Sequence, residues 1–149
     1  MKESSCRAVL ALLLAVLCLS CQKQEAVSPL LSAGQTKQAV LGKWKIKEIT
    51  YQLCRQGSCT NTNYKGTAHD FFEFRSDSAF LVYTTAASYQ QHDSFKADYK
   101  LPGAFILTRG FWSAKYNVKE CSAGKMTLEC SYVGSDPYAK FTDIYYLYR

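Results

Sequence analysis

Cysteine is the residue type with the most chemistry to offer in this sequence, and four cysteines stand as two pairs. Cys54 and Cys59 flank the short segment Arg-Gln-Gly-Ser, whereas Cys121 and Cys130 stand farther apart along the chain. Four cysteines allow three pairings. The spacing favours a Cys54–Cys59 disulfide across a turn, which would contribute about 2 kcal/mol. A second bridge, Cys121–Cys130, requires a loose loop or a bulge.

A four-cysteine metal site is the alternative use of these residues. Zinc ribbons contain Cys-x-x-Cys pairs, and neither pair of cysteines here has that spacing. We therefore expect no metal site.

Catalytic motifs are not evident elsewhere in the chain. His69 and His92 are the only two histidines, and neither lies in a metal-binding or nucleophile motif. Phosphate-binding and dinucleotide-binding glycine patterns are lacking as well. We predict no catalytic residues, no cofactor and no enzymatic activity, although a triad assembled from distant residues, such as a serine with His92 and Asp93, stays open.

The basic residues are spread along the chain. The formal net charge is +6, and the aromatic residues between the lysines could in principle stack on single-stranded nucleic acid. Because the charge is not clustered, we read it as a solubilising surface and expect no nucleic-acid partner.

The N-terminal segment has the three parts of an export signal. Lys2 and Arg7 precede a run of twelve apolar residues, 8–19, and the small residue Ser20 follows. A membrane-spanning helix needs about 20 apolar residues, so this run is too short. We expect residues 1–20 to be a signal peptide that is removed.

The tetrad Cys18-Leu19-Ser20-Cys21 resembles the bacterial lipobox, whose last cysteine is acylated. Ordinary cleavage after Ser20 is the alternative, but it would leave Cys21 as a fifth, odd cysteine in an oxidising compartment. The resemblance implies a lipid anchor on Cys21 in the cell envelope, with the outer membrane as the expected site. Gln22-Lys23-Gln24-Glu25 resembles a surface-export signal, and the periplasmic and surface faces both stay open.

The segment after the lipobox reads as a linker. Residues 21–35 combine serine, proline and glycine with no sustained period, which is typical of a flexible tether. Residues 36–149 then have the size and apolar content of one domain.

Period-two alternation of apolar residues repeats along that domain at short intervals. A single helical turn or two is expected near residues 36–41. The strands are expected at 42–53, 70–75, 79–85, 95–101, 104–109, 112–121, 125–133 and 141–149. Eight antiparallel strands joined by short links close most simply into an up-and-down barrel, which leaves no exposed edge. The fold class is therefore all-β, with a two-sheet sandwich as the rival.

Two short motifs add a family resemblance. The first strand begins Gly42-Lys43-Trp44, and the chain ends in a tyrosine-rich strand with Arg149. Over residues 36–149 the chain resembles a bacterial lipocalin-like lipoprotein domain. The resemblance implies that Arg149 stacks on Trp44 at the closed end of the barrel, where a cation over an indole contributes about 0.5 to 2 kcal/mol.

A small barrel either fills its interior with side chains or holds one small ligand. We expect an apolar or amphipathic ligand among aromatic and methionine side chains near the open end, with segment 86–94 as a lid or a plain loop. The alternatives are a packed core without a ligand, and an interaction or inhibitor module that binds an envelope or host protein through segments 54–65 and 89–95. The predicted ligand-binding residues are Phe74, Tyr116, Met126, Leu128 and Tyr146.

Overall fold

A computed structural model describes residues 31–85 and 88–149. The predicted signal peptide, Cys21 and most of the tether lie outside the described residues. One helix and nine strands make up the described part of the chain: α2 (Ala33–Val40), β1 (Gly42–Arg55), β2 (Ser58–Lys65), β3 (Phe71–Phe74), β4 (Ser78–Thr84), β5 (Gln90–Leu101), β6 (Ala104–Arg109), β7 (Trp112–Cys121), β8 (Lys125–Val133) and β9 (Ala139–Tyr148). No helix among these residues is long and apolar enough to cross a membrane.

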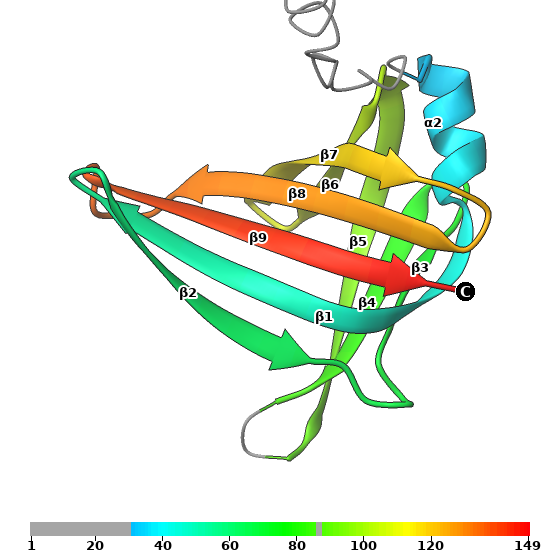
Figure 1. Ribbon diagram of the computed structural model, residues 1–149. Coiled ribbons are helices and arrows are strands. Elements are labelled where there is room, and N and C mark those ends of the chain that lie inside the picture. Colours follow the sequence, from blue (N-terminus) through cyan, green and yellow to red (C-terminus); the bar gives the residue numbers. More distant parts are fainter. Residues whose placement is uncertain (1–30, 86–87) are drawn as a thin grey trace, which may run out of the picture.

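The strands form a closed antiparallel barrel, as predicted. β1 pairs with β3, each strand from β3 to β8 pairs with the next one along the chain, and β9 pairs with β1 to close the cylinder. In Figure 1, β9 (red) lies between β1 and β8. Eight strands therefore build the wall, and the two-sheet sandwich is excluded.

The ninth strand, β2, was not predicted. The first four residues of β1 pair with β3, whereas its second half pairs with β2, from Glu48 opposite Lys65 to Arg55 opposite Ser58. β2 thus lies outside the barrel as a hairpin on the far half of β1 (Figure 1). It was missed because its residues are almost all polar and exposed on both faces, so no alternation marks it.

The loop between β2 and β3 is fixed by the buried carboxylate of Asp70. It accepts hydrogen bonds from the Tyr64 hydroxyl at 2.5 Å, from the Thr67 amide at 2.5 Å and from the Thr84 amide at 3.0 Å. Burial alone would raise the pKa of Asp70, but these hydrogen bonds outweigh it and hold that pKa below its ordinary value. Asp70 thereby ties the ends of β2 and β4 together.

The closed end of the barrel is covered by α2 (Figure 1). Ser32 caps the helix in a reciprocal pair of hydrogen bonds with Gln35. Thr36 is buried and accepts a hydrogen bond from the Gly103 amide at 2.9 Å, at the turn between β5 and β6. The folded domain therefore includes residues 31–35, which the sequence predicts to be tether.

Trp44 and Arg149 meet at this end, as the resemblance implies. The indole of Trp44 is fully buried and donates to the Val40 carbonyl at 2.8 Å. The guanidinium carbon of Arg149 lies 3.7 Å from the ring centroid, and the same side chain donates to the Leu41 carbonyl. The C-terminal strand is thus tied to the start of β1 and to the end of α2.

Candidate functional site

Aromatic rings fill the closed half of the barrel. Phe72 and Phe74 stack at 4.4 Å, Phe74 packs edge-on against Phe105 at 5.3 Å, and Phe105 stacks on Tyr116 at 5.4 Å. Such pairs add to the free energy gained from burial. Any site for a ligand must therefore lie beyond this layer, toward the other end.

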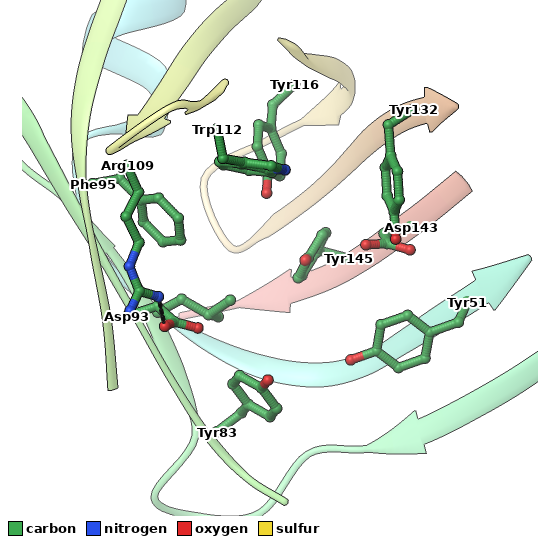
Figure 2. Close-up of a pocket in the computed structure, with 11 residues that line it drawn as sticks. Tyr51, Tyr83, Asp93, Phe95, Arg109, Trp112, Tyr116, Tyr132, Asp143 and Tyr145 are labelled. Atoms are coloured by element: carbon green, nitrogen blue, oxygen red, sulfur yellow. Dashed lines mark hydrogen bonds and ion pairs between the residues drawn. The ribbon is translucent and has the colours of Figure 1, made fainter. Parts of the chain in front are cut away.

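The open half contains a cavity of about 490 Å³. It is enclosed by side chains that point inward from β1, β4, β5, β6, β7, β8 and β9, and Figure 2 shows them around the space. The volume falls in the range of small-molecule pockets. The lining residues are Tyr51, Leu81, Tyr83, Asp93, Phe95, Arg109, Trp112, Tyr116, Tyr132, Asp143 and Tyr145.

One wall of the cavity carries an ion pair. Arg109 on β6 donates to the carboxylate of Asp93 on β5, which is only 11% exposed. Beside this pair, Phe95 packs against Trp112 with their ring centroids 5.7 Å apart. Asp93 is therefore already neutralised by a neighbour.

The opposite wall carries a second carboxylate, Asp143 on β9 (Figure 2). In the strand ladder Asp143 stands opposite Tyr51 of β1 on one side and opposite Cys130 of β8 on the other. Among the described residues it has neither an ion-pair partner nor a hydrogen-bond partner. Burial raises the pKa of Asp143 from 3.8 to about 6.

Five tyrosine hydroxyls supply the other polar groups of the cavity. Burial raises the pKa of each, most strongly for Tyr145 and Tyr116. The hydroxyls therefore stay neutral near pH 7 and can both donate and accept hydrogen bonds. The site combines flat apolar ring faces, neutral hydroxyls and one free carboxylate. Together these groups can bind a small molecule.

The possible metal ligands of the described residues do not gather into a site. No group of three histidine, cysteine, aspartate or glutamate side chains is placed to hold a metal ion within residues 31–85 and 88–149. His69 and His92 do not line the cavity.

Of the predicted ligand-binding residues, the structure brings only Tyr116 to the cavity. Phe74, Met126 and Leu128 are at most 1% exposed and belong to the filled core, so they do not line the cavity. Tyr146 points outward and is 38% exposed, because Tyr145 and Leu147 take the inward positions of β9. These four assignments are corrected accordingly.

Apart from Leu81, the lining residues that sequence reasoning missed are polar or aromatic members of the inward face. Asp143, Tyr145 and Leu147 share one face of β9, while Tyr51 continues the inward face of β1 after a bulge between Ile46 and Glu48. One signal was available in the sequence of the last strand. Asp143 is a single carboxylate that stands two and four residues before the apolar Tyr145 and Leu147, and therefore on the same face.

The predicted loops are mostly strands. Segment 54–65 contains β2, and of segment 86–94 the residues from Gln90 onward belong to β5, paired with β4. Residues 86 and 87 lie outside the described residues. Gln90–Ser94 therefore forms part of the barrel wall and is not a lid.

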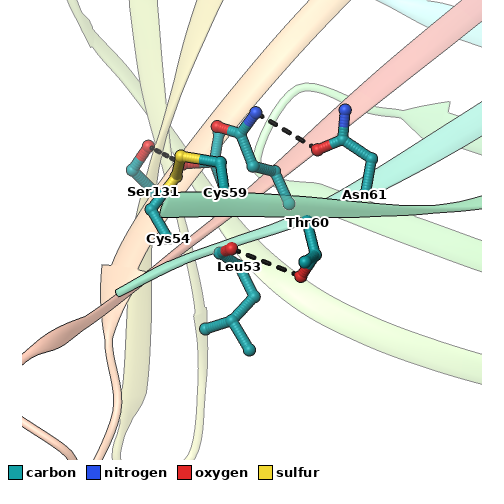
Figure 3. The surroundings of a disulfide bond; sticks show 8 residues. Leu53, Cys54, Cys59, Thr60, Asn61 and Ser131 are labelled. Atoms are coloured by element: carbon teal, nitrogen blue, oxygen red, sulfur yellow. Dashed lines mark hydrogen bonds between the residues drawn. A yellow bond between two sulfur atoms is a disulfide. The ribbon is translucent and has the colours of Figure 1, made fainter. Parts of the chain in front are cut away.

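Of the two predicted disulfides, the structure contains one. Cys54 and Cys59 form the predicted disulfide on the β1–β2 hairpin (Figure 3). Cys121 and Cys130 are free thiols, so the second predicted bridge is wrong. Cys121 stands opposite Met126, four residues before Cys130, and a strand rise of about 3.3 Å per residue separates the two thiols too far for a bond.

The fold and site define a class: an eight-stranded antiparallel barrel with a filled closed end and an open, aromatic-lined cavity. Comparison with family models finds no match, and no curated protein is similar in sequence. Among solved structures, the chain is similar to a lipocalin-like protein from Bacteroides uniformis ATCC 8492, with a TM-score of 0.45 and 12% identity over 70% of this chain and 96% of the other.

Proposed function

We propose that this protein binds one small amphipathic molecule in the cavity of its barrel. The observation that carries the proposal is the cavity itself, about 490 Å³ in volume and lined by aromatic side chains at the end that α2 does not cover. Pockets of this size and lining bind small ligands in many proteins. The tyrosine hydroxyls give a bound molecule hydrogen-bond partners that fix its orientation.

A neutral fluorescent probe, N-phenyl-1-naphthylamine, tests the proposal. Titration should give saturable enhancement at one site per protein. Leu81 lines the cavity, so Leu81→Trp should fill space and weaken the binding several-fold, whereas Val133→Trp, at an exposed position outside the cavity, should not. Binding that does not saturate, or that a folded Leu81→Trp variant retains in full, would overturn the proposal.

We also propose that the protein is an exported, lipid-anchored member of the lipocalin-like class, held in the cell envelope through Cys21. The apolar run, Ser20 and Cys21 support it. Cys21→Ser should move the protein from the membrane fraction to the soluble fraction and remove the acyl mass. Protease treatment of intact cells then distinguishes the surface face of the outer membrane from its periplasmic face.

The second candidate is a non-catalytic module that binds an envelope or host protein. Phe111 favours it, because this side chain is fully exposed at the turn between β6 and β7. Native mass spectrometry of the protein from its own envelope separates the two functions. A reproducible small adduct supports the ligand carrier, and an empty barrel with a co-purifying protein that Phe111→Ser releases supports the module.

A further inference from the structure

The cavity carries an unbalanced negative charge. Three charged side chains line it, and Arg109 is already paired with Asp93, which leaves Asp143 without a countercharge. The chain as a whole carries a formal net charge of +6. A negative cavity inside a positively charged protein is not a consequence of overall composition, and a partly buried carboxylate without a partner destabilises the empty barrel.

Aromatic side chains surround this carboxylate. Tyr51 stands opposite Asp143 in the β1–β9 ladder, and Tyr145 is the next inward residue of β9. Figure 2 shows the ring of Tyr132 beside the Asp143 carboxylate and the Arg109–Asp93 pair across the cavity. Ring faces attract cations, and a cation held between such faces and a carboxylate gains from both.

We propose that the ligand is an organic cation, an amine or a quaternary ammonium compound with an apolar body, whose charged head lies beside Asp143 among Tyr51, Tyr132 and Tyr145. This inference rests on the proposed function. The apolar body would extend toward Phe95 and Trp112, and the head would supply the countercharge that Asp143 lacks.

A metal ion fits the same place less well. Within residues 31–85 and 88–149 no second acidic, cysteine or histidine side chain joins Asp143 to form a group of three ligands. The site offers ring faces in place of those ligands, and ring faces favour weakly hydrated organic cations.

The groups that face Asp143 do not change charge in the pH range in which Asp143 does. They are Tyr51 from β1, Tyr116 from β7, Cys130 and Tyr132 from β8, and Tyr145 from β9 itself. Burial raises the pKa of every one of them, that of Cys130 to about 11. Between pH 5 and pH 8, Asp143 is therefore the group of this set that changes charge.

Calorimetric titration with four probes that share one alkyl chain tests the inference: hexylammonium, hexyltrimethylammonium, hexan-1-ol and hexanoate. The protein is the full chain with Cys21→Ser, which keeps it free of detergent. At pH 7.5 both cations should bind roughly ten-fold more tightly than the alcohol, and hexanoate more weakly than the alcohol. Asp143→Asn should abolish the preference for the cations, whereas Asp98→Asn, at an exposed position outside the cavity, should preserve it.

The outcomes separate the inference from the function on which it rests. If the alcohol binds and the cations gain nothing, or if Asp143→Asn keeps their advantage, the organic-cation inference fails while the ligand carrier stands. If none of the four probes binds and N-phenyl-1-naphthylamine does not bind either, both fail. Should Asp143→Asn not fold, the wild-type protein gives the answer: its preference for hexyltrimethylammonium must fall several-fold from pH 7.5 to pH 5, and an unchanged preference overturns the inference.

Discussion

Gly66 lies directly against the main chain of Ile46. A Cβ atom added at Gly66 would stand 1.9 Å from the Ile46 carbonyl oxygen. The Gly66 amide also donates to the Lys47 carbonyl at 3.1 Å, at the point where β1 exchanges β3 for β2 as its neighbour. The absence of a side chain at residue 66 is therefore what lets the loop after β2 close onto the barrel.

Replacing Gly66 with alanine should destabilise the fold strongly. The methyl group would have to push against backbone, which cannot rotate away, so we expect a loss of more than about 3 kcal/mol in the free energy of unfolding. Urea unfolding followed by circular dichroism measures it. Gly124→Ala is the matched control, because nothing lies within 4 Å of an added Cβ there. Equal stability of the two variants would contradict the close approach.

Replacing Arg149 should destabilise the closed end of the barrel. Arg149→Ala loses both the stack on Trp44 and the hydrogen bond to the Leu41 carbonyl, and we expect a cost of about 1 to 2 kcal/mol. Arg149→Lys keeps the charge but not the planar group, so its cost should be smaller. Thermal unfolding gives the stability, and near-ultraviolet circular dichroism reports the packing of Trp44. Binding of a cavity ligand should not change, since this end is distant from the cavity.

The disulfide should stabilise the fold, and the other two cysteines of the domain should be free thiols. Cys54→Ser with Cys59→Ser should lower the free energy of unfolding by about 2 kcal/mol, because the bridge restricts the unfolded chain. In the unfolded, unreduced Cys21→Ser protein after signal removal, alkylation should label two cysteines, Cys121 and Cys130. In the folded protein Cys121 should react first, since Cys130 is buried. Finding no alkylated cysteine would show that these two residues are bridged after all.

The barrel could be predicted because alternation was clear in most strands. In β8, for example, Met126, Leu128 and Cys130 occupy every second position and all three are buried. β9 shows the limit of the method: Ile144, Tyr146 and Tyr148 on one face are as apolar as Tyr145 and Leu147 on the other. Alternation cannot choose between two apolar faces, and only pairing with β1 and β8 fixes which face points inward.

The site was harder to predict for a related reason. Phe74, Met126 and Leu128 have the inward direction that a ligand site requires, but they lie at the wrong height along the barrel axis. The position of a residue along the barrel axis depends on the stagger between neighbouring strands, and the bulges in β1 and β7 alter this stagger. Asp143 and Tyr51 become neighbours through that stagger, although they are far apart in sequence.

Protonation of Asp143 should make the empty barrel more stable. Its pKa is raised in the folded state, from 3.8 to about 6, so its contribution to stability is fully present below about pH 4 and is lost as the pH rises through about 6. The wild-type protein should therefore lose about 1 kcal/mol between those pH values, since solvent screens a carboxylate that is only partly buried. Asp143→Asn cannot ionise and should not show this loss.

The comparison of the two proteins across pH isolates the carboxylate. At pH 7.5 Asp143→Asn should be the more stable by about 1 kcal/mol, and at pH 4.5 most of the difference should vanish, as measured by urea unfolding at each pH. Asp98→Asn, at an exposed position, should follow the wild type throughout. A bound cation should reverse the order at pH 7.5, because it binds the protein that carries the charge more tightly and therefore stabilises that protein more. An asparagine variant that is less stable than the wild type at every pH, without any ligand, would mean that Asp143 serves the fold and not a ligand.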